Sequence, residues 1–129
     1  MKDRGVQGIR RVSKQELRVG VQVAYVPAQA KRRLDHPDVQ FGFVTSVYPE
    51  RNAVYCRFWL KGKEGEALKS STDSERVVPN LLVQYDRVEP TLVANLMSLL
   101  MKGILLTNET VQAVVSSTNA ALDKANSVP

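Results

Sequence analysis

The clearest structural signal lies in residues 41–60, which read FGFVTSVYPERNAVYCRFWL. Two runs rich in β-branched and aromatic residues, which favour strands, flank the polar residues 49–52. Proline suits the second position of a turn and asparagine tolerates positive φ, so Pro-Glu-Arg-Asn is typical of a turn. We therefore expect one strand over Phe41–Tyr48, a turn, and another strand over Ala53–Leu60.

Three further short strands are predicted around this central pair. Apolar residues alternate from Leu17 to Tyr25, with Gly20 inside the run and Pro27 ending it. After the polar residues 61–74, Glu75–Val78 and Leu82–Tyr85 complete the set, separated by Pro79 and a short turn. Five short strands left as an open sheet would expose two edges, so the pattern predicts a small closed barrel.

Beyond residue 89 the apolar spacing changes to three and four, which indicates helix. The first helix is expected over Thr91–Lys102, with Pro90 where a helix can begin and Gly103 just past its end. Thr107 and Asn108 are expected to cap a second helix.

These elements predict a single chain organised in three parts. The 129 residues and the 43% hydrophobic content are those of an ordinary globular protein with a real core. We expect a flexible basic arm over 1–16, a small barrel over 17–89, and a helical pair over 90–129. The fold class is mainly β: a five-stranded small barrel of Src-homology or Tudor type, with two C-terminal α-helices either packed on the barrel or forming an interface.

Positive charge is concentrated at the start of the chain. Residues 1–33 carry nine basic and two acidic side chains, a net of +7, whereas residues 34–129 carry nine basic and eleven acidic ones, a net of −2. Such asymmetry favours a polyanionic partner, although a basic arm can also serve only solubility. The candidate phosphate contacts are Arg10, Arg11, Lys31, Arg32 and Arg33.

The strand over Ala53–Leu60 has two chemically distinct faces. Apolar and polar or aromatic residues alternate along this strand. The alternation directs the apolar residues, of which Leu60 is the last, toward the barrel interior. The opposite set, Tyr55, Arg57 and Trp59, then faces outward. These residue types stack nucleic-acid bases or anchor protein partners. Two interpretations stay open: the C-terminal helices cover Tyr55 and Trp59, or the face is exposed to a ligand.

Nothing in the sequence combines into a catalytic site. The one cysteine, Cys56, lies in mid-strand on the predicted interior face and is expected to be an inert core residue. The one histidine, His36, has Asp35 and Asp38 as neighbours but no second histidine or cysteine at ligand spacing. We expect this cluster to order its loop by hydrogen bonds. The prediction is a non-enzymatic protein with no cofactor, no metal and no small-molecule substrate.

The predicted cellular compartment rests on three features that we do not find in the sequence. One cysteine makes no internal disulfide, the first residues have no apolar signal region, and the longest apolar run is interrupted by polar residues. We predict a cytoplasmic protein without membrane contact.

Part of the chain resembles the Tudor- and KOW-type small β-barrels. The matching pieces are LRVGVQV at 17–23, GFVTSV at 42–47, VYCRF at 54–58 and VPNLLV at 78–83. The resemblance covers residues 17–87 and implies a Gly-x-Val in the second strand and a proline-led helical turn before the last strand. The loop at 27–40 is longer than the turn of a KOW motif.

A narrower resemblance is to small phage-encoded proteins of uncharacterised function, carried by HPD at 36–38, GFVTSV at 42–47 and CRFW at 56–59. It implies a bacterial cytoplasm and no mechanism.

Two functions compete. The first is a nucleic-acid-binding accessory protein that holds phosphates with the arm and the loop at 31–33. The second is a protein-interaction or assembly module, either a phage factor acting on a host protein or a homo-oligomer formed through the C-terminal helices. Small barrels bind peptides, proteins and nucleic acids alike, so the fold class does not separate them.

Overall fold

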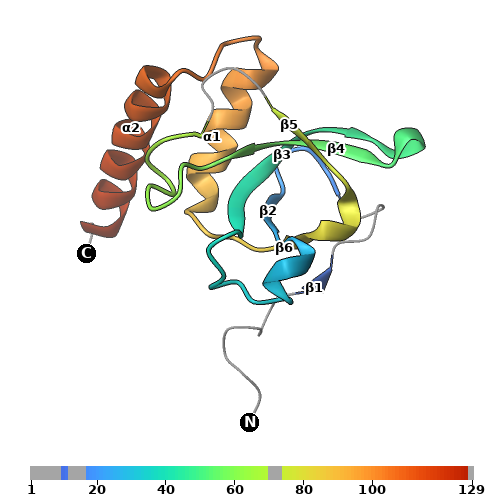
Figure 1. Ribbon diagram of the computed structural model, residues 1–129. Helices are drawn as coiled ribbons and strands as arrows, with labels where there is room; N and C mark the ends of the chain where they lie inside the picture. The colour runs from blue at the N-terminus through green and yellow to red at the C-terminus, as the bar shows by residue number, and fades with distance from the viewer. Residues whose placement is uncertain (1–9, 12–16, 70–73, 128–129) are drawn as a thin grey trace.

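The computed structural model describes residues 10–11, 17–69 and 74–127. Most of the described chain folds into six short strands followed by two helices (Figure 1). The strands are β1 (Arg10–Arg11), β2 (Gln22–Tyr25), β3 (Gln40–Tyr48), β4 (Ala53–Phe58), β5 (Glu75–Val77) and β6 (Leu82–Gln84). The helices are α1 (Pro90–Met101) and α2 (Asn108–Ser127).

All six strands belong to one antiparallel sheet with the order β1-β6-β2-β3-β4-β5. The sheet therefore has two ends, β1 and β5, and no pairing between them closes it within the described residues. The mainly-sheet architecture with two C-terminal helices is confirmed, whereas the closed barrel is not.

The central hairpin forms as the sequence predicts. β3 and β4 pair along most of their length and are joined by a 3₁₀ turn at Pro49–Arg51. Asn52 ends this turn with φ of 49°, the left-handed conformation that asparagine tolerates. A second proline-led 3₁₀ turn, Pro79–Leu81, precedes β6, as the resemblance to small barrels implies.

The hydrophobic core consists of three clusters. Two of them lie on opposite faces of β3 and β4, and the third lies at the loop between β2 and β3. One cluster lies on the concave side of the sheet, and it includes Val23, Val44, Val54, Cys56 and Phe58. A second lies between the opposite side and the helices, and it includes Phe43, Trp59, Leu92, Leu96, Leu106 and Val111. The third lies beneath the loop that joins β2 to β3, and it includes Ala24, Val26, Ala30, Val39 and Val83.

The helices form a layer against β3 and β4, side by side with each other (Figure 1). Gly103, with φ of 80°, ends α1 as predicted, since its amide and that of Ile104 donate to the carbonyls of Leu100 and Leu99. Thr107 caps α2, as predicted, by accepting a hydrogen bond from the amide of Thr110 at 3.2 Å.

A buried glutamine fixes the chain that leads into the helices. Gln22 of β2 is only 4% exposed, and its amide nitrogen donates to the Val88 carbonyl at 2.9 Å. Its amide oxygen accepts from the Val88 backbone N–H at 3.1 Å. This reciprocal pair satisfies a buried polar side chain and holds the entry to α1 against the sheet.

Three sequence predictions need correction. β2 begins at Gln22 rather than Leu17, because the chain turns at Gly20, where φ is 92°. This turn leaves Val19 48% exposed instead of on the core face. β4 ends at Phe58, so Leu60, predicted to face the interior, is 43% exposed. Of the predicted arm, Arg10–Arg11 form β1, and the rest of residues 1–16 lies outside the described residues.

Gly42 offers a direct test of how closely β3 and β4 approach. A Cβ at this position would overlap the carbonyl oxygen of Arg57 and lie 2.9 Å from the Phe58 Cα. Because neither backbone atom can move independently of the sheet, we expect Gly42→Ala to lower the free energy of unfolding by about 3 kcal/mol or more in urea titrations. Gly62→Ala is the control: its Cβ would meet no atom within 4 Å, and its φ of 81° predicts a loss of only about 1 kcal/mol. Equal losses would contradict the close approach.

Candidate nucleic-acid interface

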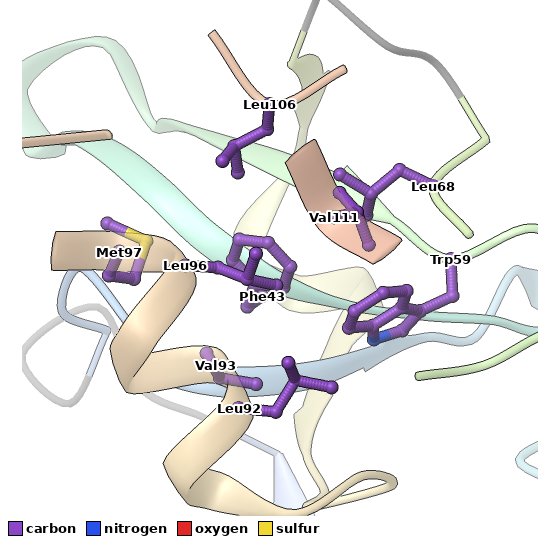
Figure 2. Packing of buried hydrophobic residues seen from close by; sticks show 9 residues of the cluster. All are labelled: Phe43, Trp59, Leu68, Leu92, Val93, Leu96, Met97, Leu106 and Val111. Atoms are coloured by element: carbon purple, nitrogen blue, oxygen red, sulfur yellow. The ribbon is translucent and has the colours of Figure 1, made fainter. Parts of the chain in front are cut away.

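The structure separates the three residues predicted on the outer face of β4. Trp59 follows the strand and is 2% exposed, with its ring centroid 5.9 Å from that of Phe43 (Figure 2). Arg57 is 3% exposed, and its guanidinium donates to the Leu106 carbonyl at 3.4 Å. Both side chains therefore lie beneath the helical layer, and neither is available to stack a base.

Tyr55 has a different environment. It is half-buried and makes an edge-to-face contact with Tyr48, with ring centroids 5.7 Å apart. Arg51 lies over the Tyr48 ring at 5.6 Å from its centroid. The helices thus cover Trp59 and Arg57, while Tyr55 belongs to a small aromatic group near the β3–β4 turn.

The basic loop presents its cations on a tight backbone turn. A 3₁₀ turn at Ala28–Ala30 is followed by Lys31 and Arg32, whose φ values of 51° and 67° are left-handed. Arg33 makes two hydrogen bonds to Asp35, at 3.1 and 3.0 Å. These bonds lower the pKa of the Asp35 carboxyl, so the pair stays ionised. Lys31 and Arg32 are exposed and form no ion pair with the described acids.

The sheet brings the two predicted basic segments to the same end of the molecule. β1 pairs with β6, with Arg11 opposite Val83. Val83 packs with Ala30 in the cluster beneath the loop, and Ala30 directly precedes the cations at 31–33. Figure 1 shows the 3₁₀ turn at 28–30 close to the dark-blue β1, with β6 beside them.

The histidine loop is ordered by its own hydrogen bonds, as expected. The His36 Nδ1 accepts from the Asp38 backbone N–H at 3.0 Å, and the Asp38 carboxylate accepts from Gln29 at 3.1 Å. Lys61 donates to the carbonyls of Pro37 and Val39. Across the described ranges, no group of three or more histidine, cysteine, aspartate or glutamate side chains is placed to hold a metal ion.

A cavity of about 510 Å³ lies between the β2–β3 loop and the segment after β4. No sequence pattern predicts this cavity, because its walls come from residues 25–41 and 59–69, which meet only in the folded chain. Two cations line it, and both are engaged: Lys61 bonds the loop carbonyls, and Lys69 bonds Gln40 and Glu75 at 3.0 and 3.1 Å. The Trp59 indole N–H, in the same wall, has no hydrogen-bond partner among the described residues.

Comparison with known proteins finds no similar one: no protein-family model, no curated protein and no solved structure matches this chain. Neither helix that the structure describes is long and apolar enough to cross a membrane.

Arg57 is expected to be a structural residue that links β4 to the helices. Arg57→Met keeps much of the apolar stem but removes the buried guanidinium that donates to the Leu106 carbonyl. We expect the free energy of unfolding to fall by about 2–3 kcal/mol, measured by urea denaturation. Arg51→Met is the matched control, since this exposed cation lies over the Tyr48 ring and forms no ion pair among the described residues, so its loss should cost less than about 1 kcal/mol. A smaller effect at Arg57 than at Arg51 would contradict the assignment.

Cys56 is expected to resist thiol reagents while the protein is folded. Burial, with a smaller contribution from Glu75, raises the pKa of its thiol from an ordinary value of 9.0 to about 12. The native thiol is therefore protonated at pH 8 and enclosed by the core, whereas the thiol of the unfolded chain is partly ionised there. Reaction with a disulfide reagent at pH 8 should be at least about a hundredfold slower in buffer than in denaturing urea. Similar rates in the two solvents would show that the strand opens readily.

Proposed function

We propose that this protein binds the phosphate backbone of nucleic acid through a basic edge formed by β1 and the loop at 31–33. The observation that carries the proposal is the pairing of β1 with β6, which sets Arg10 and Arg11 beside the loop that carries Lys31 and Arg32. Two basic segments some twenty residues apart in sequence thereby contribute to one surface. Clustered basic residues are the electrostatic footprint of a polyanion-binding protein.

The conformation of the loop supports this role. Lys31 and Arg32 occupy left-handed backbone conformations that cost a lysine or arginine about 1 kcal/mol or more relative to glycine. Their exposed ammonium and guanidinium groups have no carboxylate partner among the described residues, whereas Arg33 is neutralised by Asp35. Charges that are held outward and uncompensated favour contact with phosphates.

Recognition by this edge would be independent of base sequence. Phosphate contacts position a protein on nucleic acid, and base contacts specify a sequence. The residues expected to stack bases, Arg57 and Trp59, are buried, and Tyr55 packs on Tyr48. We accordingly propose a non-enzymatic accessory protein of the cytoplasm that coats or bridges nucleic acid rather than reading it.

The topology supports relating this sheet to the Src-homology, Tudor and KOW-type barrels. In those small barrels a proline-led helical turn precedes the last strand, as Pro79–Leu81 precedes β6 here, and β6 pairs with β2. We propose that β2 to β6 form a partly open barrel of that type, with β1 added at one edge.

Salt-dependent binding tests the proposal. We expect labelled duplex DNA or RNA to bind in fluorescence anisotropy at about 50 mM salt and to lose most of its affinity at about 200 mM. The double variant Lys31→Asn with Arg32→Gly removes two charges and suits the left-handed backbone, so it should fold normally. It should bind about tenfold or more weakly, and the slope of log affinity against log salt should fall by about 2.

The matched control is Lys63→Gln with Arg76→Gln, which removes two exposed cations outside the basic edge. This control should bind as the unaltered protein does. Equal losses in the two double variants would mean that only net charge matters, and an absence of binding at low salt would reject the proposed function.

A further inference from the structure

The second surface of interest is an apolar groove along α1. It has a volume of about 660 Å³ and lies between α1 and the segment 18–21 that precedes β2. The helix contributes Pro90, Ala94, Met97 and Met101, and the opposite wall includes Val19 and Val21. This groove shares no residue with the basic edge.

The groove is long enough for a short peptide, and small residues line its floor. Its helical positions, 90, 94, 97 and 101, are spaced by four, three and four residues, so they form one stripe along roughly 16 Å of the helix. The floor is narrow because Gly20 lies close to Met97, whose Cγ is 3.8 Å from where a Cβ of Gly20 would be. Small residues at 20, 94 and 98 leave room for another main chain to approach.

Large apolar side chains are exposed along this groove and past its end. Met101 is 80% exposed and Val19 is 48% exposed, although both line the groove. Ile104 and Leu105, which follow α1, are 42% and 56% exposed. Exposed apolar side chains gathered in a groove favour an interaction site, and methionine side chains adapt to a partner's shape.

The charged residues of the groove all have one sign. Arg18 and Lys102 line it, no carboxylate does, and neither cation forms an ion pair within the described residues. The complementary ligand carries apolar side chains on one face and carboxylates beside them. Phosphates would gain nothing from the apolar floor, and a two-fold contact between copies would bring Arg18 and Lys102 of both copies together at an electrostatic cost.

We propose that this groove binds an amphipathic helix of a partner protein, with leucine- or methionine-type residues on its buried face and glutamate or aspartate along its flanks. The helix would lie along α1, in the manner of other helix-in-groove complexes. Its carboxylates would pair with Arg18 and Lys102. The protein would then join nucleic acid at the basic edge to an acidic protein segment at the groove.

The test uses a panel of labelled synthetic peptides of about 16 residues, long enough for four helical turns. The panel presents leucine and methionine at helical spacing in several registers, each flanked by glutamate. Matched peptides carry lysine in place of glutamate, or the same residues in scrambled order. We expect at least one acidic amphipathic peptide to bind the full chain tenfold or more tightly than its lysine and scrambled counterparts in fluorescence anisotropy.

Two valines with nearly equal exposure provide matched variants. Val19→Glu alters the groove, where Val19 is 48% exposed, and Val78→Glu alters a surface outside the groove lining, where Val78 is 46% exposed. Val19→Glu and Met101→Glu should each weaken the acidic peptide tenfold or more, while Val78→Glu should leave its affinity unchanged. Arg18→Gln with Lys102→Gln should weaken it about threefold and reduce its salt dependence. Circular dichroism of each variant is the check that it folds.

Other outcomes overturn the proposal. If no peptide in the panel is preferred over its controls, or Val19→Glu and Val78→Glu act alike, the groove does not recognise an acidic helix. If sedimentation shows a dimer that Val19→Glu abolishes, the occupant is a second copy. If labelled DNA binding is lost on Val19→Glu, the groove belongs to the nucleic-acid surface. The Lys31 and Arg32 variant should bind the acidic peptide normally, so failure of the basic edge and failure of the groove are distinguishable.

Discussion

The structure depends on one packing arrangement, the docking of α1 and the start of α2 on the outer face of β3 and β4. Phe43 and Trp59 on the sheet meet Leu96, Leu106 and Val111 from the helical part (Figure 2). Fully burying each such side chain stabilises the fold by about 1.5–3 kcal/mol before the entropy cost of ordering it. A helix of 12 residues is marginal alone in water, so α1 exists because the sheet supports it.

This docking determines which parts of the molecule remain for binding. Because the central parts of β3 and β4 are covered on one side by helices and on the other by the core within the curved sheet, these two strands leave little of either face for a ligand. What remains are the edges, the loops and the outer side of α1. Lys31 and Arg32, which have no carboxylate partner among the described residues, lie in the loop next to the β1 edge, and several large exposed apolar side chains lie beside α1 and just after it. Function is therefore sought at the periphery of the sheet.

The elements were predictable from local sequence, whereas the covering of the outer face of β4 was left between two interpretations, of which cover by the helices holds for Trp59. Alternation in β3 and β4, the turn before Asn52 and the cap at Thr107 act within a few residues, so their patterns indicate structure directly. Alternation also grouped Arg57 with Trp59, but it does not say what covers that face. The answer required Leu106, about fifty residues later. Gly20 fits an alternating strand by spacing, and only its left-handed φ of 92° shows that the chain turns there.

Because sequence patterns act over a few residues, they also determine how much of each candidate site could be predicted. The basic loop was predictable because three adjacent cations need no partner to be recognised, whereas its proximity to β1 depends on the pairing of β6 with two strands. The groove was not predictable, because its walls are seventy residues apart in sequence and Val19 was expected in the core. Leu92 and Leu96 suffice to dock α1 on the sheet, yet Met101 on the same helix is largely exposed. Met101 lies beside Arg18 and Lys102 in the groove, and this combination of exposed apolar and cationic side chains is what the proposed acidic amphipathic helix would complement.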